Sequence, residues 1–176
     1  MNIFDTDIPD VKIIEPEKFG DARGFFFESF RASWLPEHVF VQDNHSKSTN
    51  GILRGLHYQL TKPQGKLVRV LSGRVLDVAV DLRKSSTTFG CHVAVELDDQ
   101  DCRMLWVPPG FAHGFVVLSD EAEFFYKCTD YYAPEDERSI RWDDSDLGID
   151  WQITEPPILS QKDSAATSFK DAEVFN

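Results

Sequence analysis

Short runs of alternating apolar and polar residues, separated by turn residues, dominate the chain from about residue 66 onward. The clearest run is RVLDVAVDL (74–82), in which every second residue from position 76 to 82 is a large aliphatic and two aspartates, Asp77 and Asp81, lie between them. A period of two is typical of a strand with one face buried and the other exposed. This pattern predicts a β-sheet protein.

Further runs of the same kind are broken by turn signals such as Ser72-Gly73 and the acidic segment 98–101. They are KLVRVL (66–71), CHVAVEL (91–97), RMLWV (103–107), GFVVL (114–118) and EFFYKCT (123–129). LRGLHYQ (53–59), which precedes them, is also expected to be a strand. Their regular spacing predicts an all-β sandwich or barrel. Helical signals are limited to a turn or two in 33–40 and 144–151, and the small, polar segment 164–176 is expected to be helix or a loosely packed peripheral tail.

Length and charge narrow the class of protein. A chain of 176 residues with no repeat or linker suits a single domain over 1–176. The net charge of −12 makes a nucleic-acid partner unfavourable. Three widely spaced cysteines form neither a disulfide framework nor a zinc knuckle. With no basic, apolar leader and no run long enough to span a bilayer, we expect no membrane association and a cytoplasmic location.

Ionisable residues gather in short clusters among apolar or glycine residues. Buried charges cost several kcal/mol unless they are paired, so such clusters usually have a partner or a function. The clusters are DARGFFFE (21–28), QDN (42–44), LRGLHYQ (53–59), QGKLVRV (64–70), PPGFAHGF (108–115), EFFYKCTDYY (123–132) and LSQKD (159–163).

This series, together with DVAVDLR, resembles the dTDP-4-dehydrorhamnose 3,5-epimerase family in the same order, from about Phe4 to Asp163. The resemblance implies a cupin-type jelly roll with a few short helices, and a homodimer whose site is shared across subunits. It also implies an isomerase that needs no cofactor and no metal, acting on a dTDP-4-keto-6-deoxyhexose in dTDP-rhamnose production.

His57 has three interpretations: a metal ligand, a catalytic base or a histidine hydrogen-bonded in a core. Metal-binding cupins carry an H-x-H pair, but Gln59 stands where the second histidine would be. PPGFAH supplies His113, and two histidines without a suitably spaced carboxylate make a poor metal site. The pattern alone leaves the core histidine open, whereas the family resemblance implies the base.

The chemistry of a 4-keto sugar gives these residues roles. The protons on C3 and C5 lie next to a carbonyl, and a neutral imidazole can remove them. By resemblance His57 is this base, Asp163 orients it, Lys66 stabilises the charge on the C4 oxygen and Tyr126 donates a proton on the opposite face. From pattern alone, Asp163 could equally be a helix N-cap, Lys66 a solvated lysine and Tyr126 a core aromatic.

The remaining candidates concern the nucleotide. Arg23 and Arg54 suit the diphosphate, because a guanidinium binds phosphate as a fork. By resemblance the segment 21–28 reaches into the neighbouring subunit. The other positions that the family implies are Glu28, Gln42, Asp43 and Asn44 on the nucleotide, Phe19 and Tyr132 near the base, and His113, Glu137 and Lys162 on the substrate.

Arg54 and His57 have opposite parity, so an ideal strand would send them to opposite faces. Both can serve one site only if the strand bends or bulges at Gly55, or if Arg54 reaches around the strand's end. Three other functions remain to be separated from the double epimerase: a mono-epimerase acting at C3 or C5 only, a metal-dependent cupin such as a dioxygenase, and a non-catalytic sugar-nucleotide binding module.

Overall fold

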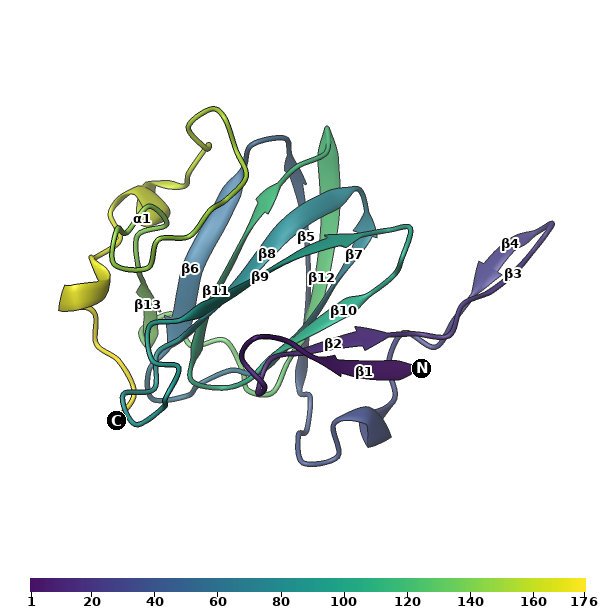
Figure 1. Ribbon diagram of the computed structural model, residues 1–176, viewed down its shortest axis with the longest axis horizontal. Coiled ribbons are helices and arrows are strands. Elements are labelled where there is room, and N and C mark those ends of the chain that lie inside the picture. The colour runs from purple at the N-terminus through teal and green to yellow at the C-terminus, as the bar shows by residue number, and fades with distance from the viewer.

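Two antiparallel sheets enclose a shared apolar interior in the computed structural model, which describes residues 1–176 (Figure 1). The first sheet has the order β1-β2-β10-β7-β12-β5 and the second the order β13-β6-β11-β8-β9. The first comprises β1 (Asn2–Asp5), β2 (Lys12–Glu15), β5 (Gln42–Thr49), β7 (Lys66–Ser72), β10 (Met104–Val107) and β12 (Glu121–Cys128). The second comprises β6 (Leu53–Gln59), β8 (Arg74–Asp81), β9 (His92–Asp98), β11 (Phe111–Val117) and β13 (Glu137–Ser139). The all-β prediction is confirmed.

Every strand predicted from the periodicity is present, and β11 differs most from its expected bounds. It begins at Phe111 rather than at Gly114, because the chain turns at Gly110, whose φ is +93°, and pairs with β8 directly afterwards. Residues 33–40 form only the 3-10 turn Ala32–Trp34, and 144–151 form turns without a helix.

The strand β8 corrects the expectation of one exposed face, since all but its first residue are buried. Val75 and Ala79 face the interior between the sheets. Leu76, Val78 and Val80 face the other side, where a second apolar cluster covers them. β8 lies between β11 and β9, so both of its edges and both of its faces are occupied. Asp77 and Asp81 are therefore completely buried rather than solvated.

The C-terminal residues 164–176 contribute to that covering cluster. Phe175 N–H donates to Leu82 O at 3.0 Å, and the Tyr58 hydroxyl donates to Glu173 O at 2.5 Å. The segment follows the single α-helix, α1 (Gln161–Ser164), and includes the 3-10 turn Phe169–Asp171. Ordered contacts thus hold it on the outer face of the second sheet, where a loosely packed tail had been one expectation.

A two-stranded hairpin, β3 (Phe19–Asp21) and β4 (Gly24–Phe26), projects away from both sheets (Figure 1). All six of its residues are exposed, including three phenylalanines, Phe19, Phe25 and Phe26. Such an apolar projection is typical of a segment that contacts another molecule. None of the protein's helices is long and apolar enough to cross a membrane.

Candidate active site

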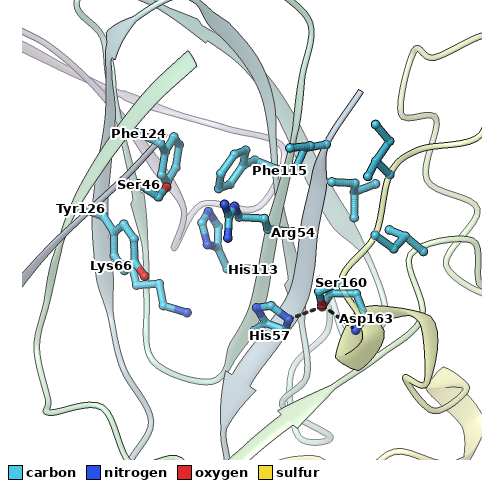
Figure 2. A pocket seen from close by; sticks show the side chains of 14 residues that line it. Ser46, Arg54, His57, Lys66, His113, Phe115, Phe124, Tyr126, Ser160 and Asp163 are labelled. Atoms are coloured by element: carbon cyan, nitrogen blue, oxygen red, sulfur yellow. Dashed lines mark hydrogen bonds and ion pairs between the residues drawn. The ribbon is translucent and has the colours of Figure 1, made fainter. Parts of the chain in front are cut away.

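A cavity of about 410 Å³ opens between the two sheets and is lined by all of the expected catalytic side chains (Figure 2). Its walls come from β6 and β11 of the second sheet, from β5, β7 and β12 of the first, and from the segment that enters α1. The polar and ionisable side chains that line it are Ser46, Arg54, His57, Lys66, His113, Tyr126, Ser160 and Asp163.

His57 and Asp163 form a hydrogen-bonded pair at one wall of the cavity (Figure 2). His57 Nε2 lies 2.5 Å from Asp163 Oδ1, although the two residues are 106 positions apart in sequence. β6 presents the histidine and α1 presents the aspartate, which is only 4% exposed. The pair leaves Nδ1 of His57 as the ring nitrogen free to accept a proton.

The contacts around Asp163 favour its charged, deprotonated form. Burial alone would raise the pKa of Asp163, but hydrogen bonding to His57, the charge of that ring and the Ser160 hydroxyl outweigh it and hold the pKa below its usual value. A second carboxylate, Glu137, lies 3.9 Å from His57 Nδ1 and is paired with Lys162 and the Tyr132 hydroxyl. Two carboxylates therefore flank the ring, Asp163 at Nε2 and Glu137 on the side of Nδ1.

The predicted distortion at Gly55 is confirmed, and it brings Arg54 and His57 into one cavity. His57 lies opposite His113 of β11, and Arg54 lies opposite Phe115. An advance of three residues along β6 therefore corresponds to an advance of two along β11. This is a β-bulge. Gly55 has a φ of +126°, and a Cβ there would lie 2.5 Å from the Cα of Gly114. Only glycine fits this backbone without movement.

Tyr126 and Lys66 lie on the first sheet, across the cavity from His57 (Figure 2). Burial raises the pKa of Tyr126 to about 12, so its hydroxyl keeps its proton at neutral pH. Burial also lowers the pKa of Lys66, which is 8% exposed at the start of β7. The cavity thus has an imidazole on one side and a phenol and an amine on the other.

A second histidine–carboxylate pair joins His113 in the cavity wall to Asp77 on β8 behind it. His113 Nε2 is 2.9 Å from Oδ1 and 3.0 Å from Oδ2 of Asp77, which is fully buried. Sequence reasoning missed Asp77, because its alternation with aliphatic residues was interpreted as a solvent-exposed face. No local signal in the sequence could have linked it to His113, which is 36 positions away on another strand.

Apart from Arg54, which lines the cavity, the expected nucleotide-binding residues divide into two groups. Gln42 accepts from the Tyr132 N–H at 3.0 Å, Asn44 accepts from the Gln42 side chain, and Tyr132 bonds Glu137, so these positions are linked beside the cavity. Asp43 has the opposite parity on β5 and pairs with Lys127 at 2.7 Å.

The second group lies on or beside the projecting hairpin. Phe19 and Arg23 are part of the hairpin, and Arg23 pairs with Asp21. Glu28 follows the hairpin in sequence and pairs with Arg31. None of these three residues lines the cavity of the same chain. No three His, Cys, Asp or Glu side chains are grouped so as to hold a metal ion.

Comparison with known proteins identifies relatives over nearly the whole chain. A family model described as dTDP-4-dehydrorhamnose 3,5-epimerase matches residues 5–171. The dTDP-4-dehydrorhamnose 3,5-epimerase of Shigella flexneri is 56% identical over 99% of both chains. That of Neisseria gonorrhoeae is 52% identical over 98% of this chain, which spans 54% of the relative's length.

A solved structure gives the same result. The dTDP-6-deoxy-D-glucose-3,5-epimerase of Legionella pneumophila, crystallised in complex with dTDP-4-keto-L-rhamnose, superimposes with a TM-score of 0.95. The two sequences are 54% identical, and the match covers 98% of this chain and 94% of that one. The cupin-type jelly roll expected from the resemblance is confirmed.

Proposed function

Because the chain belongs to the dTDP-4-dehydrorhamnose 3,5-epimerase family, we propose that it inverts C3 and C5 of dTDP-4-dehydro-6-deoxy-glucose for dTDP-L-rhamnose biosynthesis. The observation that carries this proposal is the His57–Asp163 pair, which lies across one cavity from Tyr126. An inversion at carbon needs a base on one face and an acid on the other, and this cavity offers both.

His57 acts as the base in this proposal. The C4 carbonyl makes the protons on C3 and C5 acidic, and Nδ1 is the nitrogen that accepts them because Nε2 is held by Asp163. Asp163 fixes the ring and stabilises the imidazolium as it forms. Each inversion leaves one proton on His57, which must pass to solvent before the second inversion begins.

The enolate intermediate needs a stabilised oxygen. Lys66 is buried in the cavity wall, where a cationic donor acts at low dielectric and is worth more than in water. His113, held by the buried Asp77, offers a second polar group from β11 of the opposite sheet. We assign Lys66 to the C4 oxygen, and His113 to substrate binding.

Tyr126 supplies a different proton on the opposite face, and it regains one from solvent after each inversion. Its pKa of about 12 keeps the hydroxyl protonated until the carbanion, a far stronger base, accepts its proton. Its ring packs 5.9 Å from that of Phe124, which fixes its direction. The inverted product therefore depends on the O–H, whereas proton removal by His57 does not.

The nucleotide binds at the cavity mouth in this proposal, with Arg54 on the diphosphate and with Gln42, Asn44, Tyr132, Glu137 and Lys162 around it. Phe19, Arg23 and Glu28 lie on or beside a hairpin that projects away from their own cavity, which supports a homodimer in which each hairpin completes the partner's site. Asp43 contributes in this proposal through its pair with Lys127. The single domain needs no cofactor and acts in the cytoplasm.

Solvent deuterium exchange tests the function. The protein is incubated with dTDP-4-dehydro-6-deoxy-glucose in deuterium oxide, and incorporation at each carbon is followed by NMR. Exchange with inversion at both C3 and C5 is expected, and His57→Ala should abolish it. Exchange at one carbon only would identify a mono-epimerase. The absence of exchange at both carbons would contradict the proposal. Tight dTDP binding without exchange would indicate a binding module. Stoichiometric Fe, Mn or Zn, found by elemental analysis, would indicate a metal-dependent cupin.

A further inference from the structure

The carboxylate of Asp163 is held at both oxygens. Oδ1 lies 2.5 Å from His57 Nε2, and Oδ2 accepts a hydrogen bond from the Ser160 hydroxyl at 2.7 Å. In return, Asp163 N–H donates to Ser160 Oγ at 3.1 Å. Ser160 is the N-cap of α1, and its hydroxyl accepts from the Asp163 N–H as N-cap serines do, while it also donates to the Asp163 carboxylate. The serine therefore fixes both the backbone and the side chain of the aspartate.

We propose that Ser160 is a positioning residue for proton abstraction, because it fixes the rotation of the Asp163 carboxylate and so directs Oδ1 at His57. This inference rests on the proposed function, in which His57 is the base. Without the hydroxyl, the carboxylate is freer to rotate about its Cβ–Cγ bond out of the plane that it now has. Such a rotation moves Oδ1 away from His57 Nε2, and the ring then loses the bond that orients it.

Ser160 also acts on the charge of the pair. A hydroxyl that donates to a carboxylate stabilises the deprotonated form, and this bond is one of the contacts that hold the pKa of Asp163 below its usual value. Loss of the hydroxyl should raise the pKa of Asp163, so activity should be lost at a higher pH on the acid side. The other charged or titratable groups around the pair are Arg54 on β6, Lys66 on β7, His113 on β11, Tyr126 on β12, Glu137 on β13 and Lys162 on α1.

The chain contains a matched control eight residues further on. Ser168 caps the 3-10 turn Phe169–Asp171, its hydroxyl donates to Asp171 Oδ2 at 2.7 Å, and Asp171 N–H donates back at 3.3 Å. The spacing and the bonds match those of Ser160 and Asp163. Asp171, however, is bonded to no histidine and lies outside the cavity. Ser168→Ala therefore removes the same kind of cap without touching the base.

The test compares Ser160→Ala, Ser160→Thr and Ser168→Ala by deuterium exchange at C3 and C5 and by kcat and KM across pH. Ser160→Ala should lower kcat about tenfold, the scale set by the loss of a hydrogen bond to a charged group. KM should stay the same, and the acid limb of kcat/KM should move to higher pH. Ser160→Thr, which keeps the hydroxyl, should restore both, and Ser168→Ala should behave like the unmodified protein.

Two outcomes would overturn the inference. One is an unshifted pH profile and an unchanged kcat in Ser160→Ala, and the other is an equal loss in Ser168→Ala, which would indicate a general effect of losing a cap. If Ser160→Ala does not fold, Ser160→Gly replaces it, because glycine is tolerated at an N-cap but has no hydroxyl. Lack of exchange in the unmodified protein would instead contradict the proposed function, so the two failures are distinguishable.

Discussion

Replacing Gly55 by alanine should both destabilise the protein and displace its base. The added Cβ would lie 2.5 Å from Gly114 Cα and 2.8 Å from His113 O, and both neighbours are backbone atoms. Carbon atoms in contact are normally about 3.5–4.0 Å apart, so β6 and β11 must separate by about 1 Å. Overpacking of this kind costs about 1–3 kcal/mol. The positive φ adds about 1–2 kcal/mol, because alanine avoids that region.

We therefore expect Gly55→Ala to lose about 3 kcal/mol of unfolding free energy, measured by urea denaturation with tryptophan fluorescence. Gly24 is a matched control for stability, since its φ of +129° is nearly the same but a Cβ there would meet nothing within 4 Å. Gly24→Ala should lower the free energy of unfolding only by the cost of placing alanine at a positive φ. The difference between the two variants isolates the close approach of β6 and β11.

The bulge also positions His57, so activity should fall in folded Gly55→Ala. A displacement of about 1 Å at a reacting group can cost about 100-fold in rate. Deuterium exchange at C3 and C5, measured well below the unfolding midpoint, provides the assay. If Gly55→Ala unfolds at the same urea concentration as Gly24→Ala and exchanges deuterium at the original rate, the bulge does not direct the base and the reasoning is refuted.

Three further predictions concern single side chains. Tyr126→Phe should retain deuterium wash-in by His57 but lose the inverted product, and NMR of the recovered sugar separates the two. Asp77→Ala should cost about 3 kcal/mol in urea unfolding because it leaves a buried histidine unpaired, whereas Asp77→Asn keeps an acceptor and should cost less. Burial alone would raise the pKa of Asp81, but bonds from Arg83, Ser86 and Thr88 hold it at about 2. The ionised carboxylate should therefore contribute about 2 kcal/mol to the free energy of unfolding above pH 4, and this contribution should be lost as the pH falls towards 2. Asp81→Asn should abolish that pH dependence in urea unfolding.

Strands were predictable because their signal is local. Alternation and turn residues fix where each run begins, which is why β6, β7 and β8 have nearly the bounds that the sequence indicates. The conflict of parity between Arg54 and His57 is local as well, and it predicts either a bend or bulge at Gly55 or an Arg54 that reaches around the strand's end; the structure has the bulge. The sequence does not show which faces of the strands are covered by other segments of the chain. Whether β8 is buried on one side or on both depends on the C-terminal segment that packs against it.

The two aspartates of β8 show where sequence reasoning about a site reaches its limit. Asp81 is bonded by Arg83, Ser86 and Thr88, all within seven residues, so the run DLRKSSTT already contains the partners of this buried charge. Asp77 has no such neighbours, and its partner His113 is 36 positions away on another strand. A buried carboxylate whose donors are local stabilises a turn, whereas one whose donor comes from another strand can hold a side chain in a cavity. Asp163, which is 106 positions from His57, belongs to the second kind, and only the folded sheets bring such pairs together.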